Sequence, residues 1–171
     1  MKMRVGGGVA NDVGTALGVA GVNMPAPAVY EAISSGVTDG VFFPMETMYA
    51  FKIAELAKHT YSNPQGMYTT AFGLIMNSDS YDGLSAAHKA CVDKLTGVEM
   101  SRRVGTYWDE ADALGLEKFK EAGGKLTVAS AADQAYFADK TAGIEAKVVA
   151  AASERGVDGA AALAFFRSQL K

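Results

Sequence analysis

The chain has 171 residues, 49% of them hydrophobic, and a formal net charge of −3. Such a length fits one domain or two small lobes, and the apolar content is sufficient for a packed core. The slight acidity without a basic stripe argues against a nucleic-acid partner, and no apolar run approaches the roughly 18 residues that span a membrane. Cys91 is the only cysteine, which excludes an internal disulfide, and the absence of a CxxC pair or a Cys/His cluster predicts no metal site.

The first third of the chain alternates between strand and helix patterns. Short strands are predicted around Met3, Val22 and Val41. Helices are predicted at 9–17, 27–36 and 45–56. Because strand–helix–strand units with short links pair in parallel through right-handed crossovers, this order predicts an α/β fold.

The middle of the chain has a different pattern. The near-continuous apolar run at 69–76 predicts a buried strand, which follows a turn-rich connector at 62–66. Residues 85–122 are almost all compatible with helix, a span far longer than the usual helix of about 11 or 12 residues. We therefore expect this helix to kink at a glycine or to run across two lobes.

The C-terminal part predicts one more strand and two helices. The strand is Lys125–Val128, and the helices lie at 131–155 and 160–170. Ser130 and Asp133 have the spacing of a capping box at the start of the first of these helices. We expect a mixed, mostly parallel sheet that contains the strands near Met3, Val22, Val41 and Leu126, with the strand at 69–76 apart from it.

Arg4 is the first candidate site residue, because it ends the first predicted strand. Open parallel sheets bind ligands outside the carboxyl ends of their strands, and an arginine there can hold a carboxylate through two parallel hydrogen bonds. The alternative is a solvated surface arginine, or one that pairs with Asp12. Phe42 and Phe43 are adjacent in a strand, so they point to opposite faces; one could meet a ligand, although core packing of both is the alternative.

Other chemical motifs are weaker. The run Gly6-Gly7-Gly8 follows a strand and opens a helix, but it lacks GxGxxG spacing and no Walker sequence is present, so we interpret it as a tight turn and expect no cofactor. His59 and His88 have no recognisable nucleophile motif, and we predict no catalytic residue.

The acidic cluster Asp109, Glu110 and Asp112 could perform acid–base chemistry or form a solvated helix face. Tyr107 and Trp108 are predicted to pack between helix and sheet.

Three segments, in order, resemble the substrate-binding proteins of TRAP transporters, the DctP type. Lys2–Gly7 resembles the KIR motif that opens the second lobe of these proteins. Met24–Ile33, followed by Ser35–Gly40, resembles their MPxxEvYeALqxGvvDG stretch, which is the most specific of the three. Phe72–Asn77, followed by Ser80–Ser85, resembles their strand that ends in asparagine and leads to a helix.

The resemblance implies a periplasmic binding protein rather than an enzyme. Such a protein captures a small organic acid between two α/β lobes and delivers it to membrane permease subunits. The arginine of the family that pairs with the ligand carboxylate corresponds to Arg4. A ligand-contacting position of the family, often asparagine, corresponds to Phe43. Phe42 is the alternative candidate for this contact. The glutamate of the MPxxE motif is replaced by Ala28. An apolar residue at position 43 implies a ligand less polar than a sugar acid or a C4-dicarboxylate.

The resemblance also implies a division of the chain. Residues 1–62 would begin the C-terminal lobe, 63–104 would supply a strand and helix of the N-terminal lobe, and 105–171 would complete the C-terminal lobe. The match is to the C-terminal half only, so we expect a fragment without the signal peptide and most of the first lobe, with exposed apolar surface that favours homo-oligomers. The rival hypotheses are a small α/β enzyme acting on a carboxylate or phosphate, and a self-associating module without a ligand.

Overall fold

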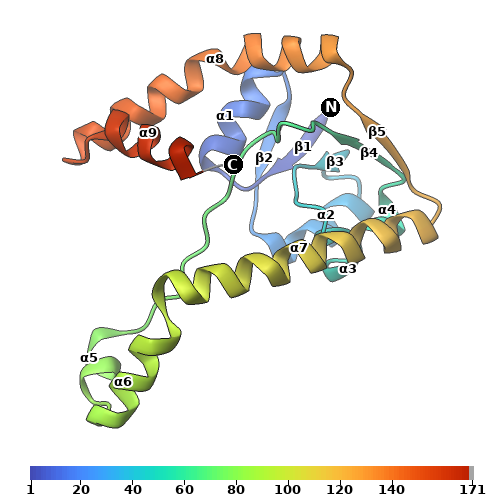
Figure 1. Ribbon diagram of the computed structural model, residues 1–171. Helices are drawn as coiled ribbons and strands as arrows, with labels where there is room; N and C mark the ends of the chain where they lie inside the picture. Colours follow the sequence, from blue (N-terminus) through green and yellow to red (C-terminus); the bar gives the residue numbers. More distant parts are fainter. Residues whose placement is uncertain (170–171) are drawn as a thin grey trace. The chain divides into compact units, whose positions relative to one another are not determined.

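A computed structural model describes residues 1–169 of the chain (Figure 1). The chain divides into two compact units. The first contains Met1–Phe42, His59–Tyr68 and the chain from Leu126 onward, and the second contains Phe43–Lys58 and Thr69–Lys125. The α/β class predicted from the sequence is confirmed.

A three-stranded parallel sheet forms the centre of the first unit, with the strand order β2-β1-β3. Its strands are β1 (Lys2–Val5), β2 (Ala20–Asn23) and β3 (Gly40–Val41). Arg4 of β1 is in register with Val22 on one side and Val41 on the other. The predicted strands near Met3, Val22 and Val41 therefore share one sheet, and their carboxyl ends lie at the same edge.

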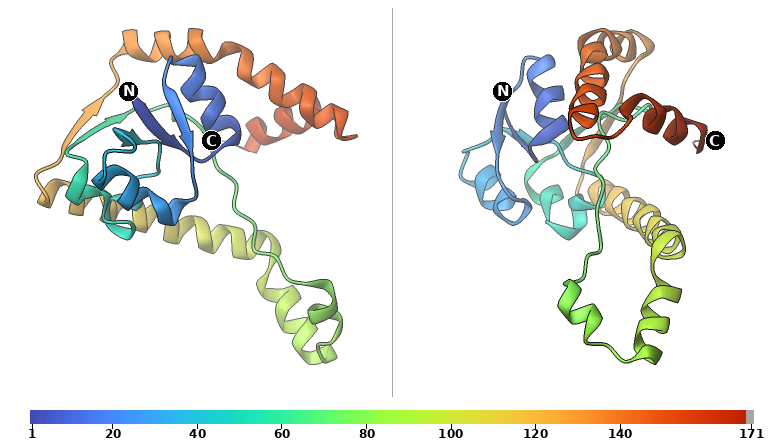
Figure 2. Two further views of the ribbon diagram at one scale, coloured as in Figure 1. Left: turned by 180° about the vertical axis from the view of Figure 1, so that it is seen from behind. Right: turned by 90° about the vertical axis from the view of Figure 1, so that its left-hand side faces the viewer.

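Helices of the first unit connect and cover these strands. They are α1 (Gly8–Ala16), the 3₁₀ turn Ala26–Ala28, α2 (Val29–Ser34), α8 (Ala131–Glu154) and α9 (Gly159–Gln169). Val13 of α1 and Val29 of α2 are buried with Val5 in the core. Ser130 and Asp133 form the predicted capping box of α8. Figure 2 shows α9 folded back along α8, and the two helices contact each other.

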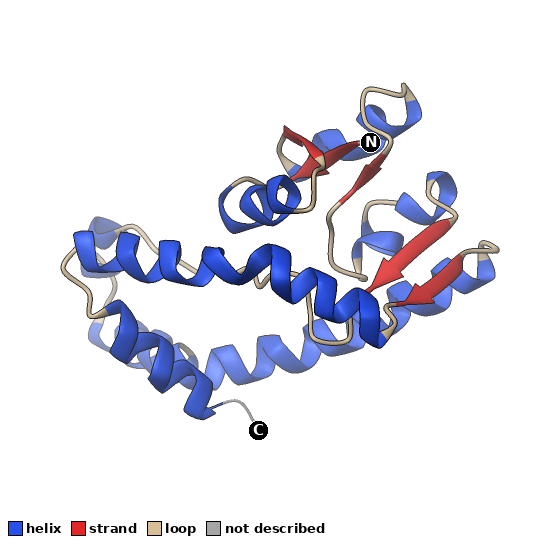
Figure 3. Cartoon of the chain, turned by 90° about the horizontal axis from the view of Figure 1, so that it is seen from above, coloured by secondary structure: helices blue, strands red, loops and turns tan. Residues whose placement is uncertain are grey.

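Leu126 was expected in the main sheet, and this expectation is wrong. It belongs to β5 (Lys125–Val128), which pairs with β4 (His59–Ser62) in a separate two-stranded sheet. Figure 3 shows the strands in these two groups. Hydrogen bonds from Lys125 N to Lys58 O (2.9 Å) and from Ala129 N to Ser62 O (2.8 Å) frame the pair. A strand at 59–62 was not predicted, because its polar, four-residue sequence carries only a weak strand signal.

The second unit is built on a long helix. Its elements are α3 (Thr47–Ala50), α4 (Ile53–Leu56), α5 (Ser78–Asp82), α6 (Ala86–Leu95) and α7 (Gly97–Glu121). The helix expected at 85–122 changes direction between α6 and α7 (Figure 1), at Gly97, whose φ is 68°. The helix expected at 45–56 is interrupted by Lys52, whose φ of 56° lies in the left-handed region. Phe119 and Ile53 are fully buried in this unit.

The strand expected at 69–76 is absent, and the prediction is wrong. Residues 69–77 form an irregular segment that leads into α5 (Figure 1). Leu74 and Ile75 are 80% and 90% exposed. A strand requires a neighbour that pairs with its backbone groups, and no strand among residues 1–169 pairs with this segment.

Tyr107 and Trp108 do not pack between a helix and a sheet as expected. Tyr107 is 63% exposed. Trp108 stacks on Phe72, with the ring centroids 4.7 Å apart and the planes inclined by 25°. The partner of the indole is therefore a loop residue of the same unit.

Candidate functional site

The carboxyl ends of β1, β2 and β3 gather around the side chain of Arg4. Its Nε and Nη2 both donate to the carbonyl oxygen of Met24, at 3.0 Å each, and Nη1 donates to the carbonyl oxygen of Phe42 at 3.5 Å. Met24 directly follows β2, and Phe42 directly follows β3. The two carbonyl groups therefore fix the plane of the guanidinium at the edge of the sheet where the sequence predicted a site.

Arg4 is a buried cation, only 5% exposed. Burial lowers the pKa of its guanidinium, and the nearby phenol of Tyr68 opposes that shift. An arginine remains charged in proteins, so a positive charge stands at the end of β1. The interpretation of Arg4 as a solvated surface residue is wrong, and Asp12 pairs instead with Lys147 of α8 at 2.8 Å.

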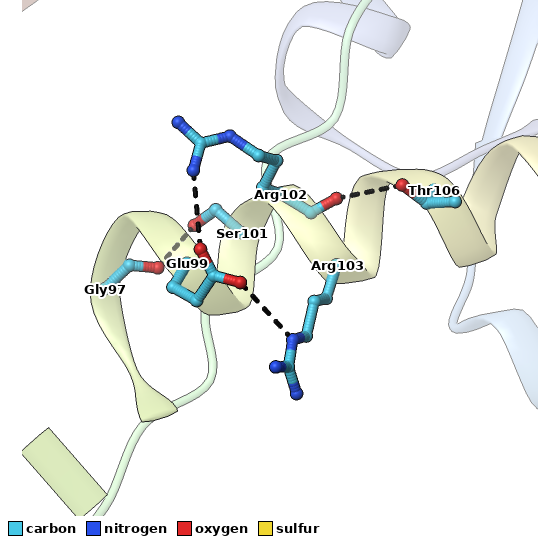
Figure 4. Close-up of polar contacts among 6 residues, drawn as sticks. All are labelled: Gly97, Glu99, Ser101, Arg102, Arg103 and Thr106. Atoms are coloured by element: carbon cyan, nitrogen blue, oxygen red, sulfur yellow. Dashed lines mark hydrogen bonds and ion pairs between the residues drawn. The ribbon is translucent and has the colours of Figure 1, made fainter. Parts of the chain in front are cut away.

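The other arginines have different surroundings, because all four are exposed. Figure 4 shows two of them near the start of α7, where Glu99 lies between Arg102 and Arg103. Glu99 forms ion pairs with both, at 3.4 and 3.5 Å. Arg167 of α9 pairs with Glu145 of α8. Exposed pairs of this kind contribute little energy, so Arg4 is the arginine with the burial and fixed geometry of a binding site.

Phe42 follows β3 directly, and its backbone is hydrogen-bonded to that of Arg4. Its amide donates to the Arg4 carbonyl at 2.9 Å. Its ring lies against α1, where a Cβ added at Gly14 would be 3.6 Å from Cε2. The ring therefore contributes to the packing between the strand end and the helix.

Phe43 belongs to the second unit. Its half-buried ring contacts the ring of Phe51, with the centroids 5.5 Å apart and the planes inclined by 38°. β3 ends at Val41, so the two phenylalanines follow the strand and do not alternate within it. The structure thus brings Arg4 and Phe42 together in one unit and places Phe43 in an aromatic pair of the other.

The acidic cluster on α7 divides into exposed and packed members. Asp109 and Glu110 are exposed, as a solvated helix face requires. Asp112 accepts a hydrogen bond from the backbone N of Glu46 at 2.7 Å. Burial, and then the charge of Asp112, raise the pKa of Glu46 to about 7. The Asp112 carboxylate therefore anchors the loop before α3 to α7.

Gly115 explains how closely this loop approaches α7. A side chain at position 115 would collide with the backbone of Met45 and Glu46. A glycine inside a helix usually weakens it, whereas the role of Gly115 is to allow close packing. His59 and His88 are both exposed, and no group of three or more His, Cys, Asp or Glu residues within 1–169 could hold a metal ion.

Three residues beside Arg4 were missed by the sequence interpretation: Gly6, Met24 and Tyr68. Met24 could have been found, because parallel strands bring the residues after their carboxyl ends to one edge. Tyr68 carries no comparable signal, because it lies beyond a turn in which Gln65 N donates to Asn63 Oδ1 at 3.0 Å. Gly6 was assigned to a tight turn together with its two neighbours.

Comparisons with known proteins agree with one family. Residues 1–151 match the family "Bacterial extracellular solute-binding protein, family 7" (DctP). The "C4-dicarboxylate-binding periplasmic protein DctP" of Rhodobacter capsulatus is 31% identical over 107 residues, which cover 63% of this chain and 29% of that protein.

Solved structures give the same result. A TRAP periplasmic solute-binding protein from Bordetella bronchiseptica, with bound (R)- and (S)-mandelate, has a TM-score of 0.93 and 36% identity, over 99% of this chain and 54% of that one. A TRAP solute-binding protein from Rhodoferax ferrireducens, with copurified benzoate, has a TM-score of 0.87 and 29% identity, over 98% of this chain and 53% of that one.

This chain therefore belongs to family 7 of the bacterial extracellular solute-binding proteins. It spans about half the length of the two solved relatives and less than a third of the curated one. The family is periplasmic, and its members bind small organic acids for membrane permeases. No helix among residues 1–169 is long and apolar enough to cross a membrane.

Proposed function

We propose that this chain is the part of a TRAP solute-binding protein that holds the carboxylate of an aromatic monocarboxylic acid, and that Arg4 makes the ion pair. The observation that carries the proposal is the guanidinium itself, which is buried and fixed by the Met24 and Phe42 carbonyl groups. The proposed role is reversible binding without a chemical step.

The energetics favour an arginine held in this way. A hydrogen bond to a charged group contributes about 1.5–3 kcal/mol. A guanidinium that is already oriented loses less side-chain entropy on binding than a mobile one. Nε and Nη2 donate to the Met24 carbonyl and Nη1 donates to the Phe42 carbonyl, and we propose that the ligand carboxylate adds to these contacts at the end of the guanidinium formed by Nη1 and Nη2.

The aromatic character of the ligand rests on the site residues and on the relatives. We propose that Phe42 provides apolar contact to the ligand, and that Phe43, which the family resemblance places at a position that is often asparagine, does the same. The two solved relatives were found with mandelate and benzoate. The curated relative is named for C4-dicarboxylates, so succinate is the ligand that best tests the preference.

The proposed partners and the proposed division into lobes are inferred from the family. We propose that the complete protein acts in the periplasm, closes two lobes over the acid and delivers it to permease subunits. In this proposal residues 1–62 and 105–171 belong to the C-terminal lobe, and 63–104 belong to the N-terminal lobe. We also propose that the chain self-associates through the exposed side chains of residues 72–76, because contiguous exposed apolar surface favours association.

The experiment that tests the function is calorimetric titration of the chain with benzoate, (R)-mandelate and succinate, for wild type, Arg4→Lys and Arg4→Ala. Lysine keeps the charge but loses the planar fork, so affinity for benzoate should fall at least about tenfold, and alanine should lower it about a hundredfold or more. Arg102→Ala, which removes an exposed arginine of α7, is the matched control and should change nothing.

Two results would contradict the proposal. One is wild-type chain that binds none of the three acids. The other is benzoate affinity that stays the same in both Arg4 variants. A thermal unfolding curve of each variant accompanies the titrations. If Arg4→Ala does not fold, the benzoate affinity of Arg4→Lys alone tests the proposal. Tighter binding of succinate than of benzoate would keep Arg4 in the site but contradict the aromatic preference.

A further inference from the structure

The glycine run after β1 contains one glycine that the backbone does not explain. Gly7 and Gly8 have φ values of 80° and 54°, a region that residues with a side chain rarely adopt. Gly6 has no positive φ. Its backbone conformation is therefore open to alanine and other residues, and the reason for a glycine at position 6 must lie in its surroundings.

The surroundings of Gly6 are the terminal nitrogens of Arg4. A Cβ added at Gly6 would lie 3.8 Å from Nη2 and 4.0 Å from Nη1, and no other atom outside Val5, Gly6 and Gly7 would lie within 4 Å of it. Gly6 is exposed, whereas Arg4 is buried. Gly6 is therefore an exposed residue that lies directly against the Nη1 and Nη2 atoms of the buried guanidinium.

We propose that Gly6 is a specificity-determining residue, because its lack of a side chain leaves room beside Nη1 and Nη2 for the bulky substituent of an aromatic acid. This inference rests on the proposed function. A carboxylate paired with an arginine lies about 2.7–2.9 Å from the nitrogens, which is closer than the position of a Cβ at residue 6. A small side chain there would border the carboxylate, and a branched one would extend into the space that the ring of the acid occupies.

The experiment compares wild type, Gly6→Ala and Gly6→Val in the full chain, with benzoate as the large acid and acetate as the small one. Benzoate binding is measured by calorimetry, and acetate binding by its displacement of benzoate. Gly143→Ala is the matched control, because it replaces a glycine of α8 that has open space around it and no positive φ. Thermal unfolding of each variant reports the fold.

We expect the dissociation constant for benzoate to rise about threefold in Gly6→Ala and at least about tenfold in Gly6→Val, as for one or more methyl groups in a closely fitting site. Acetate binding should change less in the same variants, and Gly143→Ala should match wild type. Melting temperatures should be unchanged or slightly higher, since replacing a glycine at a compatible φ restricts the unfolded chain.

The outcomes separate this inference from the function on which it rests. Equal benzoate affinity in wild type and both Gly6 variants would overturn the role of Gly6 and leave the role of Arg4 intact. Equal losses for benzoate and acetate would also overturn it, because size would then not be what position 6 selects. A wild-type chain that fails to bind benzoate would overturn both. If Gly6→Val unfolds, the test is made with Gly6→Ala alone, by comparing its loss of affinity for benzoate with its loss of affinity for acetate.

Discussion

Strand β1 and the segment 69–77 were both predicted to be strands, but they have different structures. β1 has a parallel neighbour on each side, and Val5 at its end is fully buried. Segment 69–77 has no strand partner among the described residues, and Ile75 is 90% exposed. The difference shows that an apolar run becomes a strand only where other backbone can pair with it, because unpaired N–H and C=O groups are not buried without cost.

The largest expected effect compares a core residue with an exposed one. Val5→Ala removes two methyl groups from a fully buried side chain, so the free energy of unfolding should fall by about 2 kcal/mol. Ile75→Ala removes more apolar surface, but from a side chain already in water, and should change stability by less than about 0.5 kcal/mol. Urea denaturation of both variants measures the difference. Equal losses would show that segment 69–77 is packed.

A second prediction concerns association through the same segment. The double variant Leu74→Glu and Ile75→Glu places two charges on the exposed side chains, which should abolish self-association by charge repulsion and loss of apolar contact. Light scattering during size exclusion, over a range of concentrations, measures the mass. Val157→Glu, at an exposed apolar position of the first unit, is the control. Wild type that stays monomeric at the highest concentration would refute this association.

The smallest expected effect is a pH dependence at Glu46, in the packed part of the second unit. Its pKa is raised to about 7 by burial, then by Asp112, while the amide of Thr47 acts in the opposite direction. Because the pKa of Glu46 is higher in the folded protein, its neutral form stabilises the fold. This stability is fully present below pH 4.5, the ordinary pKa of the group, and it is lost as the pH rises through about 7.

Glu46→Gln mimics the neutral form, so it should match wild type near pH 4.5 and be more stable at pH 8. We expect about 1 kcal/mol at pH 8, because solvent around the partly exposed carboxylate screens most of the effect. Urea denaturation across this pH range measures it. Glu110→Gln, an exposed carboxylate of α7, is the control. A Glu46→Gln advantage that is the same at both pH values would contradict the prediction.

The sequence predicted those parts of the fold that follow from periodicity and chain order. The parallel strands around Met3, Val22 and Val41 came from alternating strand and helix patterns, and Arg4 was placed at the carboxyl edge by the same argument. The family resemblance was confirmed over residues 1–151. The capping box of Ser130 and Asp133 was also predicted, because its two hydrogen bonds are local.

The parts that were missed depend on contacts between residues far apart in the chain. The pairing of β4 with β5 joins two short strands more than sixty residues apart, as the Lys58–Lys125 and Ser62–Ala129 hydrogen bonds show. The close approach of the Met45 backbone to Gly115 cannot be predicted from a helical pattern. The position of Gly6 beside the Arg4 nitrogens likewise requires the side-chain conformation of Arg4, which periodicity does not specify.

The stacking of Trp108 on Phe72 gives the chain a built-in optical reporter. Trp108 is the only tryptophan in the sequence, and its ring partner lies within the irregular segment 69–77. Indole emission changes in colour and intensity with the polarity of its surroundings. Any event that moves this segment, such as pairing with another strand, therefore changes the intrinsic fluorescence of the protein, and it can be followed in time without an added label.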